Sequence, residues 1–303
     1  MDARFVRKFP LQPAPQTALM PELPEVQTVV NTLEPALSGR AFVSATLNRQ
    51  DIVTPAGTDL CRLIVGRRIA SITRRGKRIV FSLDDGGRFY VHLGMSGRLT
   101  LANHETPLPR HTHFIARFDA PETRELRFTD PRRFGGLWWL GTEESEGEGM
   151  GPEPLTLKSK DLIRRLGRTG RAIKNALLDQ TVIAGLGNIY VDESLHAAGI
   201  HPLTPAQVLT AEQVGRLNRA IKTILRRAIR HRGSTLRDYR DANGQAGNFQ
   251  KIHRVYGRTG QPCPRCHSPI ERIVLGGRST HFCLHCQPPH KPYPAPLLRG
   301  MVV

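Results

Sequence analysis

The 303-residue sequence has no long apolar run, no recognisable secretory leader and few cysteines. A membrane-spanning helix needs about 20 consecutive apolar residues, and no stretch of the chain approaches that length. Residues 1–19 carry Arg4, Arg7 and Lys8 without a continuous apolar core, which does not fit a signal peptide. The sequence therefore argues against a membrane protein and against a secreted disulfide scaffold, and we expect a cytoplasmic protein.

Acidic residues become scarce in the second half of the chain. Up to residue 155 there are 20 Lys and Arg against 18 Asp and Glu, a net charge of +2. From residue 156 onward there are 24 against 8, a net charge of +16. This asymmetry indicates a polyanion bound mainly by the second half. Ribosomal and membrane-surface proteins are also basic, so the charge alone assigns no function.

Four of the five cysteines form two Cys-x-x-Cys pairs, Cys263 with Cys266 and Cys283 with Cys286, separated by 16 residues. This spacing is typical of a four-cysteine zinc site in a reducing compartment. All four positions are thiols and none is left open for water, so we expect one structural Zn²⁺ rather than a catalytic one. Cys61 stands alone, and the sequence assigns it no role.

Apolar periodicity predicts an α+β protein. Apolar residues recur at helical spacing from Val26 to Leu37, and Gly39 ends the pattern. Short alternating segments between Gly, Pro and Asp turns follow, as in an antiparallel β-sandwich. Helical patterns come next, and Thr210–Arg230 places apolar residues inward and arginines outward. The expected parts are a β-sandwich domain (20–140), a Glu-, Gly- and Pro-rich linker (141–160), a helical domain (161–250) and the cysteine module (251–287). Residues 1–19 are expected to be a disordered extension or the result of a start assigned too far upstream. Residues 288–303 are expected to be a disordered tail.

The stretch Met20-Pro21-Glu22-Leu23-Pro24-Glu25 decides which chemistry is possible. Inside a peptide bond the Pro21 nitrogen is an amide without an available lone pair, whereas at a chain terminus it is a secondary amine that attacks carbonyl carbons. The adduct of a secondary amine stays a cationic iminium and accepts electrons, and Glu22 supplies a carboxylate for proton transfer. The simpler interpretation is that Pro21 and Pro24 only begin a helix.

Two turns of the β-rich region present side chains suited to a base stack. Met95 follows an apolar strand in a Gly-rich turn, and Arg132 and Phe134 share a second turn. An exposed apolar side chain on a turn can act as a wedge between bases. The alternative for each is ordinary, because Met is usually core filler and an Arg beside an aromatic is common on surfaces.

Basic and glycine-rich stretches offer further candidates. Lys77 lies in Arg74-Arg75-Gly76-Lys77-Arg78, between two strand-like segments, where a solvated basic turn is the alternative. Arg171 and Lys174 lie on or beside a helical face as possible phosphate contacts. Asn188 follows Gly185-Leu186-Gly187, a tight turn into a helix whose backbone N–H groups suit phosphate. A helix–helix turn without a ligand fits the same pattern.

Together these motifs resemble the bacterial formamidopyrimidine-DNA glycosylase family over residues 20–287. The resemblance implies a bifunctional DNA repair enzyme that excises oxidised purines from duplex DNA and cleaves the abasic site by β,δ-elimination, with Pro21 exposed as the N-terminus. It implies a helix–two-turn–helix, a zinc finger and a monomer that associates with the nucleoid through DNA. By matching motifs, the catalytic residues are Pro21, Glu22, Lys77 and Arg278, and the DNA-binding residues are Met95, His111, Arg132, Phe134, Arg171, Lys174 and Asn188.

Two other functions stay open on the sequence alone. The endonuclease VIII branch prefers oxidised pyrimidines, but Leu23, the Met-Ser-Gly turn and the long loop after Gly233 favour the purine branch. An inactive zinc-containing DNA-binding protein is the second alternative, which residues 1–19 would enforce if they were retained.

Overall fold

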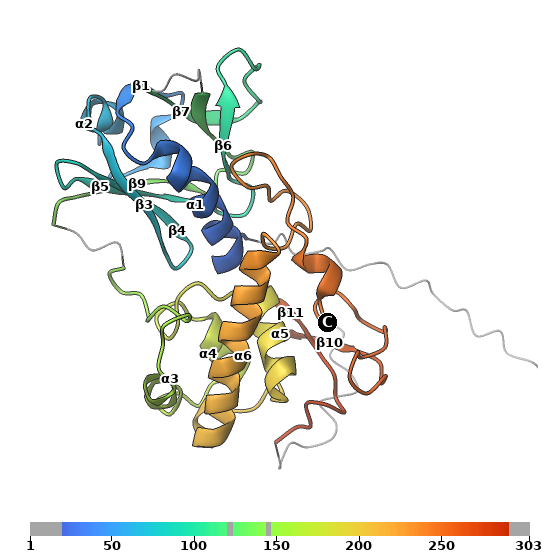
Figure 1. The fold of residues 1–303 in the computed structure, drawn as a ribbon. Helices are drawn as coiled ribbons and strands as arrows, with labels where there is room; N and C mark the ends of the chain where they lie inside the picture. The colour runs from blue at the N-terminus through green and yellow to red at the C-terminus, as the bar shows by residue number, and fades with distance from the viewer. Residues whose placement is uncertain (1–19, 120–123, 144–146, 291–303) are drawn as a thin grey trace, which may run out of the picture.

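The computed structural model describes residues 20–119, 124–143 and 147–290, so the predictions for residues 1–19 and for most of the tail lie outside it. Two halves stack along the long axis of the molecule, a β-rich half and a mainly helical half (Figure 1). Within the described residues no helix is both long and apolar enough to cross a membrane. The predicted α+β class is confirmed.

The first half is a two-sheet sandwich beside helix α1, Leu23–Leu37. The buried face of α1 carries Val26, Val29 and Leu33, as its periodicity predicts, and the helix packs against β3 and β4. The five-stranded sheet has the order β2 (Val53–Thr54), β9 (Gly136–Gly141), β5 (Arg88–His92), β4 (Arg78–Leu83), β3 (Ile69–Arg75), and the four-stranded sheet has the order β1 (Phe42–Leu47), β7 (Thr112–Phe118), β8 (Arg124–Thr129), β6 (Arg98–Asn103).

The second half is built around helix α6, Ala211–Arg230. Thr210 and Gln213 close its first turn with a reciprocal capping box, which satisfies two of the backbone donors left free at a helix start. The remaining α-helices and strands of this half are α3 (Ser159–Leu166), α4 (Ile173–Leu178), α5 (Asn188–Ala198) and the hairpin of β10 (Glu271–Leu275) and β11 (Arg278–Phe282). In the first half, the short helix α2 (Leu60–Ile64) was not predicted from the sequence.

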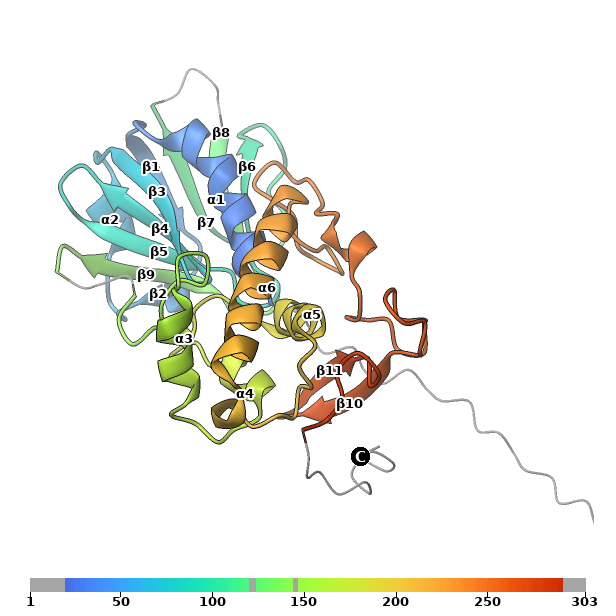
Figure 2. The same cartoon turned by 60° about the horizontal axis from the view of Figure 1, so that its bottom comes forward.

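The packing crosses the domain boundary in both directions. Tyr239 and Ala242, from the loop after α6, belong to the core of the β-sandwich, and Leu101 N–H donates to the Ala242 carbonyl at 2.7 Å. In return Leu23 of α1 packs in the core of the helical half. The loop after α6 therefore lies against strand β6, although its sequence position is in the second half (Figure 2).

Candidate active site

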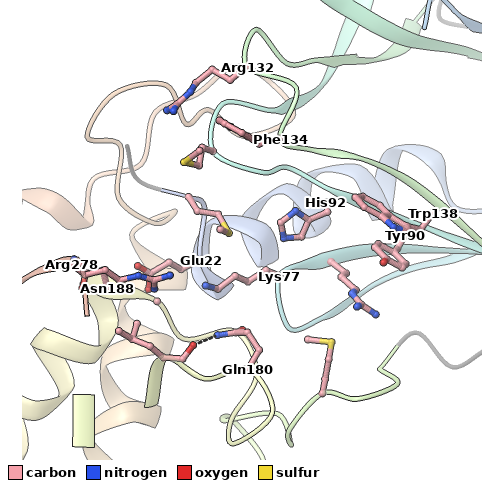
Figure 3. Close-up of a pocket in the computed structure, with 17 residues that line it drawn as sticks. Glu22, Lys77, Tyr90, His92, Arg132, Phe134, Trp138, Gln180, Asn188 and Arg278 are labelled. Atoms are coloured by element: carbon pink, nitrogen blue, oxygen red, sulfur yellow. Dashed lines mark hydrogen bonds between the residues drawn. The ribbon is translucent and has the colours of Figure 1, made fainter. Parts of the chain in front are cut away.

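A cavity of about 740 Å³ opens between the two halves of the molecule. Turns of the β-sandwich form one wall, and the start of α5 and the β10–β11 hairpin form the other (Figure 3). The predicted site residues that line it are Glu22, Lys77, Met95, Arg132, Phe134, Asn188 and Arg278, together with Met20, Arg78, Tyr90, His92, Trp138, Met150, Leu178, Gln180, Gly187 and Gly277.

Glu22 lies at the N-cap of α1, with 2 % of its surface exposed. Its carboxylate accepts N–H groups at the start of α5, from Ile189 at 2.9 Å and from Tyr190 at 3.3 Å. Burial raises the pKa of Glu22, while the positive charge of Lys77 and the α5 N–H groups oppose the rise. A buried carboxyl group with a raised pKa is suited to proton transfer near neutral pH.

A second acid, Glu25, lies one helical turn behind Glu22. Glu22 N–H donates to its carboxylate at 2.9 Å, Ser234 N–H donates at 2.6 Å and the Tyr190 hydroxyl donates at 2.5 Å. Burial, reinforced by the negative charge of Glu22, raises the pKa of Glu25 to about 7. The two carboxyl groups therefore share an environment in which both cannot ionise freely at neutral pH.

Lys77 extends into the cavity from the β3–β4 hairpin (Figure 3). Burial lowers the pKa of Lys77, and the nearby Glu22 charge partly opposes this. Glu153, in the predicted linker, anchors the hairpin because it pairs with Arg74 at 2.5 Å and accepts Gly76 N–H at 2.6 Å. Gly76 has a φ of +58°, a left-handed conformation that favours glycine, so a larger residue would strain the turn.

Asp130, fully buried, organises the turns that carry Met95, Arg132 and Phe134. Its carboxylate accepts the Ser96 hydroxyl at 2.5 Å, Arg132 N–H at 3.2 Å and Gly135 N–H at 2.8 Å. The Arg132 guanidinium lies 4.9 Å from the ring centroid of Phe134, which is 53 % exposed. The two turns are thus fixed relative to each other while their tips stay open to the cavity.

His111 lies in a separate exposed turn of the same region, with a φ of +65°. Asp130 N–H donates to its carbonyl at 3.1 Å, and His113, two residues on, contacts the Asp130 carbonyl at 2.9 Å. Asp130 therefore links three turns through its side chain and its backbone.

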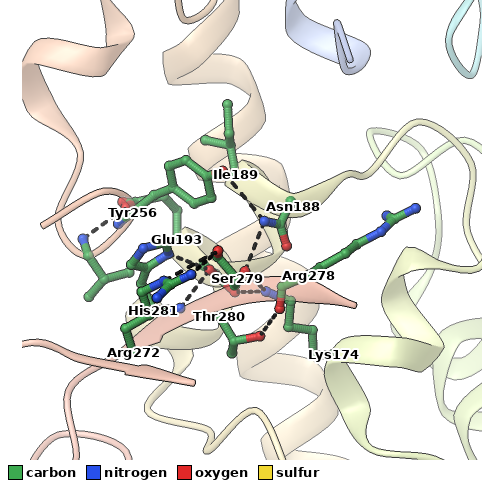
Figure 4. A network of polar contacts seen from close by, with 12 residues as sticks. Lys174, Asn188, Ile189, Glu193, Tyr256, Arg272, Arg278, Ser279, Thr280 and His281 are labelled. Carbon is green, nitrogen blue, oxygen red and sulfur yellow. Dashed lines mark hydrogen bonds and ion pairs between the residues drawn. The ribbon is translucent and has the colours of Figure 1, made fainter. Parts of the chain in front are cut away.

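The helical wall holds Arg278 at the tip of the β10–β11 hairpin. Lys174 lies beneath, where its ammonium pairs with Asp192 at 2.7 Å and donates to the Ser279 carbonyl at 2.9 Å. Asp192 also accepts His281 N–H at 2.8 Å, so α4, α5 and β11 meet in one network, and the Arg278 side chain points away from it (Figure 4). Both side chains of the pair are fully buried.

This burial disfavours the prediction that Lys174 contacts phosphate. The ammonium would have to leave Asp192 to reach a ligand, and a lone buried carboxylate is costly. The Asn188 amide nitrogen donates to the Ser279 carbonyl at 2.9 Å and to the Tyr256 hydroxyl at 3.4 Å, so a phosphate contact from this side chain would replace one of the two bonds. Arg171 is half exposed and pairs with Asp179 at 2.9 Å, outside the residues that line the cavity.

Pro21 is buried and lines a smaller pocket of about 160 Å³, together with Glu25, Arg132 and Tyr239. Met20 borders both this pocket and the larger cavity. Pro21, where a terminal amine is predicted, therefore lies next to Glu22. Its pocket opens on the side of the turn that carries Arg132.

The four cysteine sulfurs lie within 4.8 Å of one another, with Cys263 and Cys286 at 3.9 Å and Cys266 and Cys283 at 3.4 Å. Tetrahedral Zn–S bonds of about 2.3 Å put sulfurs roughly 3.8 Å apart, so the donor set fits zinc. The four cysteines are positioned to bind one zinc ion, which would fix the base of the hairpin that carries Arg278.

Sequence reasoning missed several residues of the site. Glu25 lies in the Pro-Glu-Leu-Pro-Glu stretch, but nothing in that stretch indicates that Tyr190 and Ser234 contact its carboxylate. His92 lines the cavity, and burial lowers its pKa to about 4, which leaves it neutral at physiological pH. Asp192 lies in the helix that follows the Gly185-Leu186-Gly187 turn, and only the fold reveals its pairing with Lys174.

Known proteins match almost the whole described chain. Three family models match in order: the formamidopyrimidine-DNA glycosylase N-terminal domain (20–137), the formamidopyrimidine-DNA glycosylase H2TH domain (150–240) and the zinc finger found in FPG and IleRS (260–289). The formamidopyrimidine-DNA glycosylase of Chloroflexus aurantiacus is 46% identical over 273 residues, which cover 88% of this chain and 98% of that protein.

Solved structures of DNA complexes agree with these matches. Lactococcus lactis Fpg bound to DNA with an abasic site is 36% identical, with a TM-score of 0.82 and coverage of 88% of this chain and 100% of that one. A MutM protein bound to DNA with carbocyclic 8-oxo-G is also 36% identical, with a TM-score of 0.81 and coverage of 89% and 100%.

The β-sandwich, the helix–two-turn–helix, the zinc hairpin and the cavity between them define a DNA-binding repair glycosylase. The chain belongs to the formamidopyrimidine-DNA glycosylase family. Lyase activity is typical of that family, and the oxidised-pyrimidine branch and an inactive DNA-binding protein are not favoured.

Proposed function

We propose that this protein, acting as a monomer on chromosomal DNA in the bacterial cytoplasm, excises 8-oxoguanine and formamidopyrimidines from duplex DNA and cleaves the abasic site that remains. The observation that carries this is the placement of Glu22, next to Pro21, in a cavity whose opposite walls present Lys77 and Arg278. Base excision needs the nucleotide out of the helix, because C1′ is unreachable in the duplex.

The proposed chemistry begins at a free Pro21 nitrogen. The amine attacks C1′ and displaces the damaged base, which leaves with a proton, and the sugar opens to an iminium on Pro21. Glu22 moves protons during these steps, since its carboxyl group has a raised pKa and a fixed position. The iminium then draws electrons from the sugar, so the bond to the 3′-phosphate breaks first and the bond to the 5′-phosphate second.

The other predicted residues act on the DNA. Met95 and Phe134 fill the gap left by the flipped nucleotide, and Arg132 hydrogen-bonds the orphaned cytosine. Lys77 and Arg278 hold phosphates beside the lesion and assist the eliminations. His111, Arg171 and Asn188 contact the backbone, and Lys174, in view of its burial, supports the hairpin from beneath instead.

Borohydride trapping tests the proposal, because borohydride reduces an iminium to a stable amine. A protein beginning at Pro21 should form a covalent complex with 8-oxoguanine DNA, and a protein that retains residues 1–19 should form none. Equal trapping by both proteins would refute Pro21 as the nucleophile. Pro21→Gly keeps a terminal amine and should retain partial activity, which separates loss of the amine from loss of the fold.

A further inference from the structure

A second basic surface lies on helix α6. Arg219, Lys222, Arg226 and Arg230, here called the α6 stripe, are spaced by three or four residues and so share one face of the helix. Arg219, Arg226 and Arg230 are exposed, and Lys222 is half-buried. With a rise of 1.5 Å per residue the stripe is roughly 16 Å long.

The charge of the stripe is not neutralised by its surroundings. Among the described residues, no ion pair involves any of the four stripe cations. The nearest acidic side chain on α6, Glu212, pairs with Arg216 at 2.6 Å. The adjoining helix α3 adds exposed Lys160 and Arg164, and its Asp161 pairs with Arg164 at 3.0 Å.

The stripe is separate from the active-site cavity. No residue of α6 lines the cavity or the smaller pocket. The opposite, apolar face of α6 packs against α5 and α1, the helices whose first turns border the site. Figure 1 shows α6 on the near face of the molecule with α1 above it.

We propose that the α6 stripe binds the phosphate backbone of a second DNA segment while the cavity is occupied by the first. About 16 Å of duplex carries roughly nine phosphate charges, ample for four cations on one face. When the enzyme is bound to a long DNA, other segments of that molecule lie at high effective concentration, so a weak, salt-sensitive contact suffices. The stripe then lets the enzyme pass between segments without dissociating into solution.

The experiment uses the whole protein with its cavity saturated by a short duplex that contains a stable abasic-site analogue. A fluorescent undamaged duplex is then titrated at several salt concentrations, and its binding is followed by anisotropy. The wild-type protein should form a complex with two duplexes at low salt. Replacing the stripe (R219Q, K222Q, R226Q and R230Q together) should reduce the salt slope for the second duplex by about 3 to 4.

A control with the same change in net charge removes four exposed arginines of the β-sandwich half, three of which pair with acidic side chains, and should keep the second duplex (R49Q, R62Q, R67Q and R68Q). The proposal is overturned if the wild-type protein binds one duplex only, if both quadruple variants lose the second duplex equally, or if anionic lipid vesicles bind the stripe while the second duplex does not. Excision of a short lesion duplex reports on the cavity separately, so failure of the stripe and failure of the proposed chemistry are distinguishable.

Discussion

The two ends of the cavity differ in how far their side chains are exposed to water. At one end lies Glu22, with Glu25 of the smaller pocket behind it; both are almost completely buried, and their pKa values are raised by that burial. At the other end the tips of two turns stay accessible, and Phe134 is 53 % exposed. Burial sets protonation states for proton transfer, whereas exposure leaves an apolar tip free to enter a base stack.

The anchors of the two ends differ as well. Backbone N–H groups of α5, in the other half of the molecule, hold Glu22, whereas Asp130, within the same half, holds the turns. Substitutions at the first end should therefore change the rate of the catalytic steps and weaken the contact between the two halves of the molecule. Substitutions at the second end should change which duplex is accepted.

Glu22→Gln should have the largest effect on activity. The amide keeps an acceptor for one of the two α5 N–H groups but cannot exchange protons, and general acid–base catalysis contributes about 10²- to 10⁴-fold. Single-turnover excision of 8-oxoguanine should slow by that factor, while the affinity for lesion DNA changes little. A variant that excises within a few-fold of wild type would move the proton-transfer role away from Glu22.

Lys174→Met should destabilise the protein by about 3 to 5 kcal/mol, because it leaves Asp192 buried and unpaired. The free energy of unfolding in urea measures this. Adding Asp192→Asn should restore part of the loss. If Lys174 were instead a phosphate contact, stability would stay unchanged and the salt slope of DNA binding would fall by about 1.

The pH dependence of stability should report on Glu25. Its pKa in the folded state is about 7 against 4.5 for the free group, so the folded state holds more protons between these values. The contribution of Glu25 to stability therefore falls as the pH rises from about 4.5 to about 7, by up to roughly 3 kcal/mol. Urea unfolding of wild type and Glu25→Gln at the two ends of this window should show the difference, and parallel pH profiles would contradict it.

Arg132→Ala should change specificity more than rate. Cytosine presents acceptors to the guanidinium and adenine presents a donor, so we expect roughly 1 to 3 kcal/mol of discrimination, or about five- to a hundredfold. Single-turnover excision opposite C and opposite A should lose that ratio in the variant. The neighbouring Arg133 pairs with Asp51 at 3.3 Å, so Arg133→Ala is the control that should keep it.

The sequence predicted those parts of the molecule that depend on local spacing. The start of α1 at Pro21 and Glu22, the hairpin tip of Lys77 and the four zinc ligands each follow from neighbouring residues. The two turns of Met95 and Phe134 were also placed in one region, since both end strands of the same β-rich segment.

The rest depends on contacts between distant segments. The single lysine of α4 gives no sign that Asp192, in the next helix, will pair with it and that both side chains will be buried. Burial and the charge of Glu22 raise the pKa of Glu25, and the residues that cover it and oppose the rise by hydrogen bonds, Tyr190 and Ser234, belong to the other half of the chain. The Gly- and Asn-rich loop after α6 carried no signal that Tyr239 would enter the core of the β-sandwich.

The bonds from Ile189 and Tyr190 to Glu22 join residues 167 and 168 positions apart, and this sets an order in time during synthesis. The β-sandwich leaves the ribosome first and carries Pro21, Glu22 and Lys77 with it. Its acid stays unanchored until α5 has emerged, and Arg278 follows the first residue of α5 by 90 positions. Tyr239 and Ala242 of the sandwich core also emerge late, so the nascent chain completes its first half, and gains the means to cut DNA, only after most of the chain has been made.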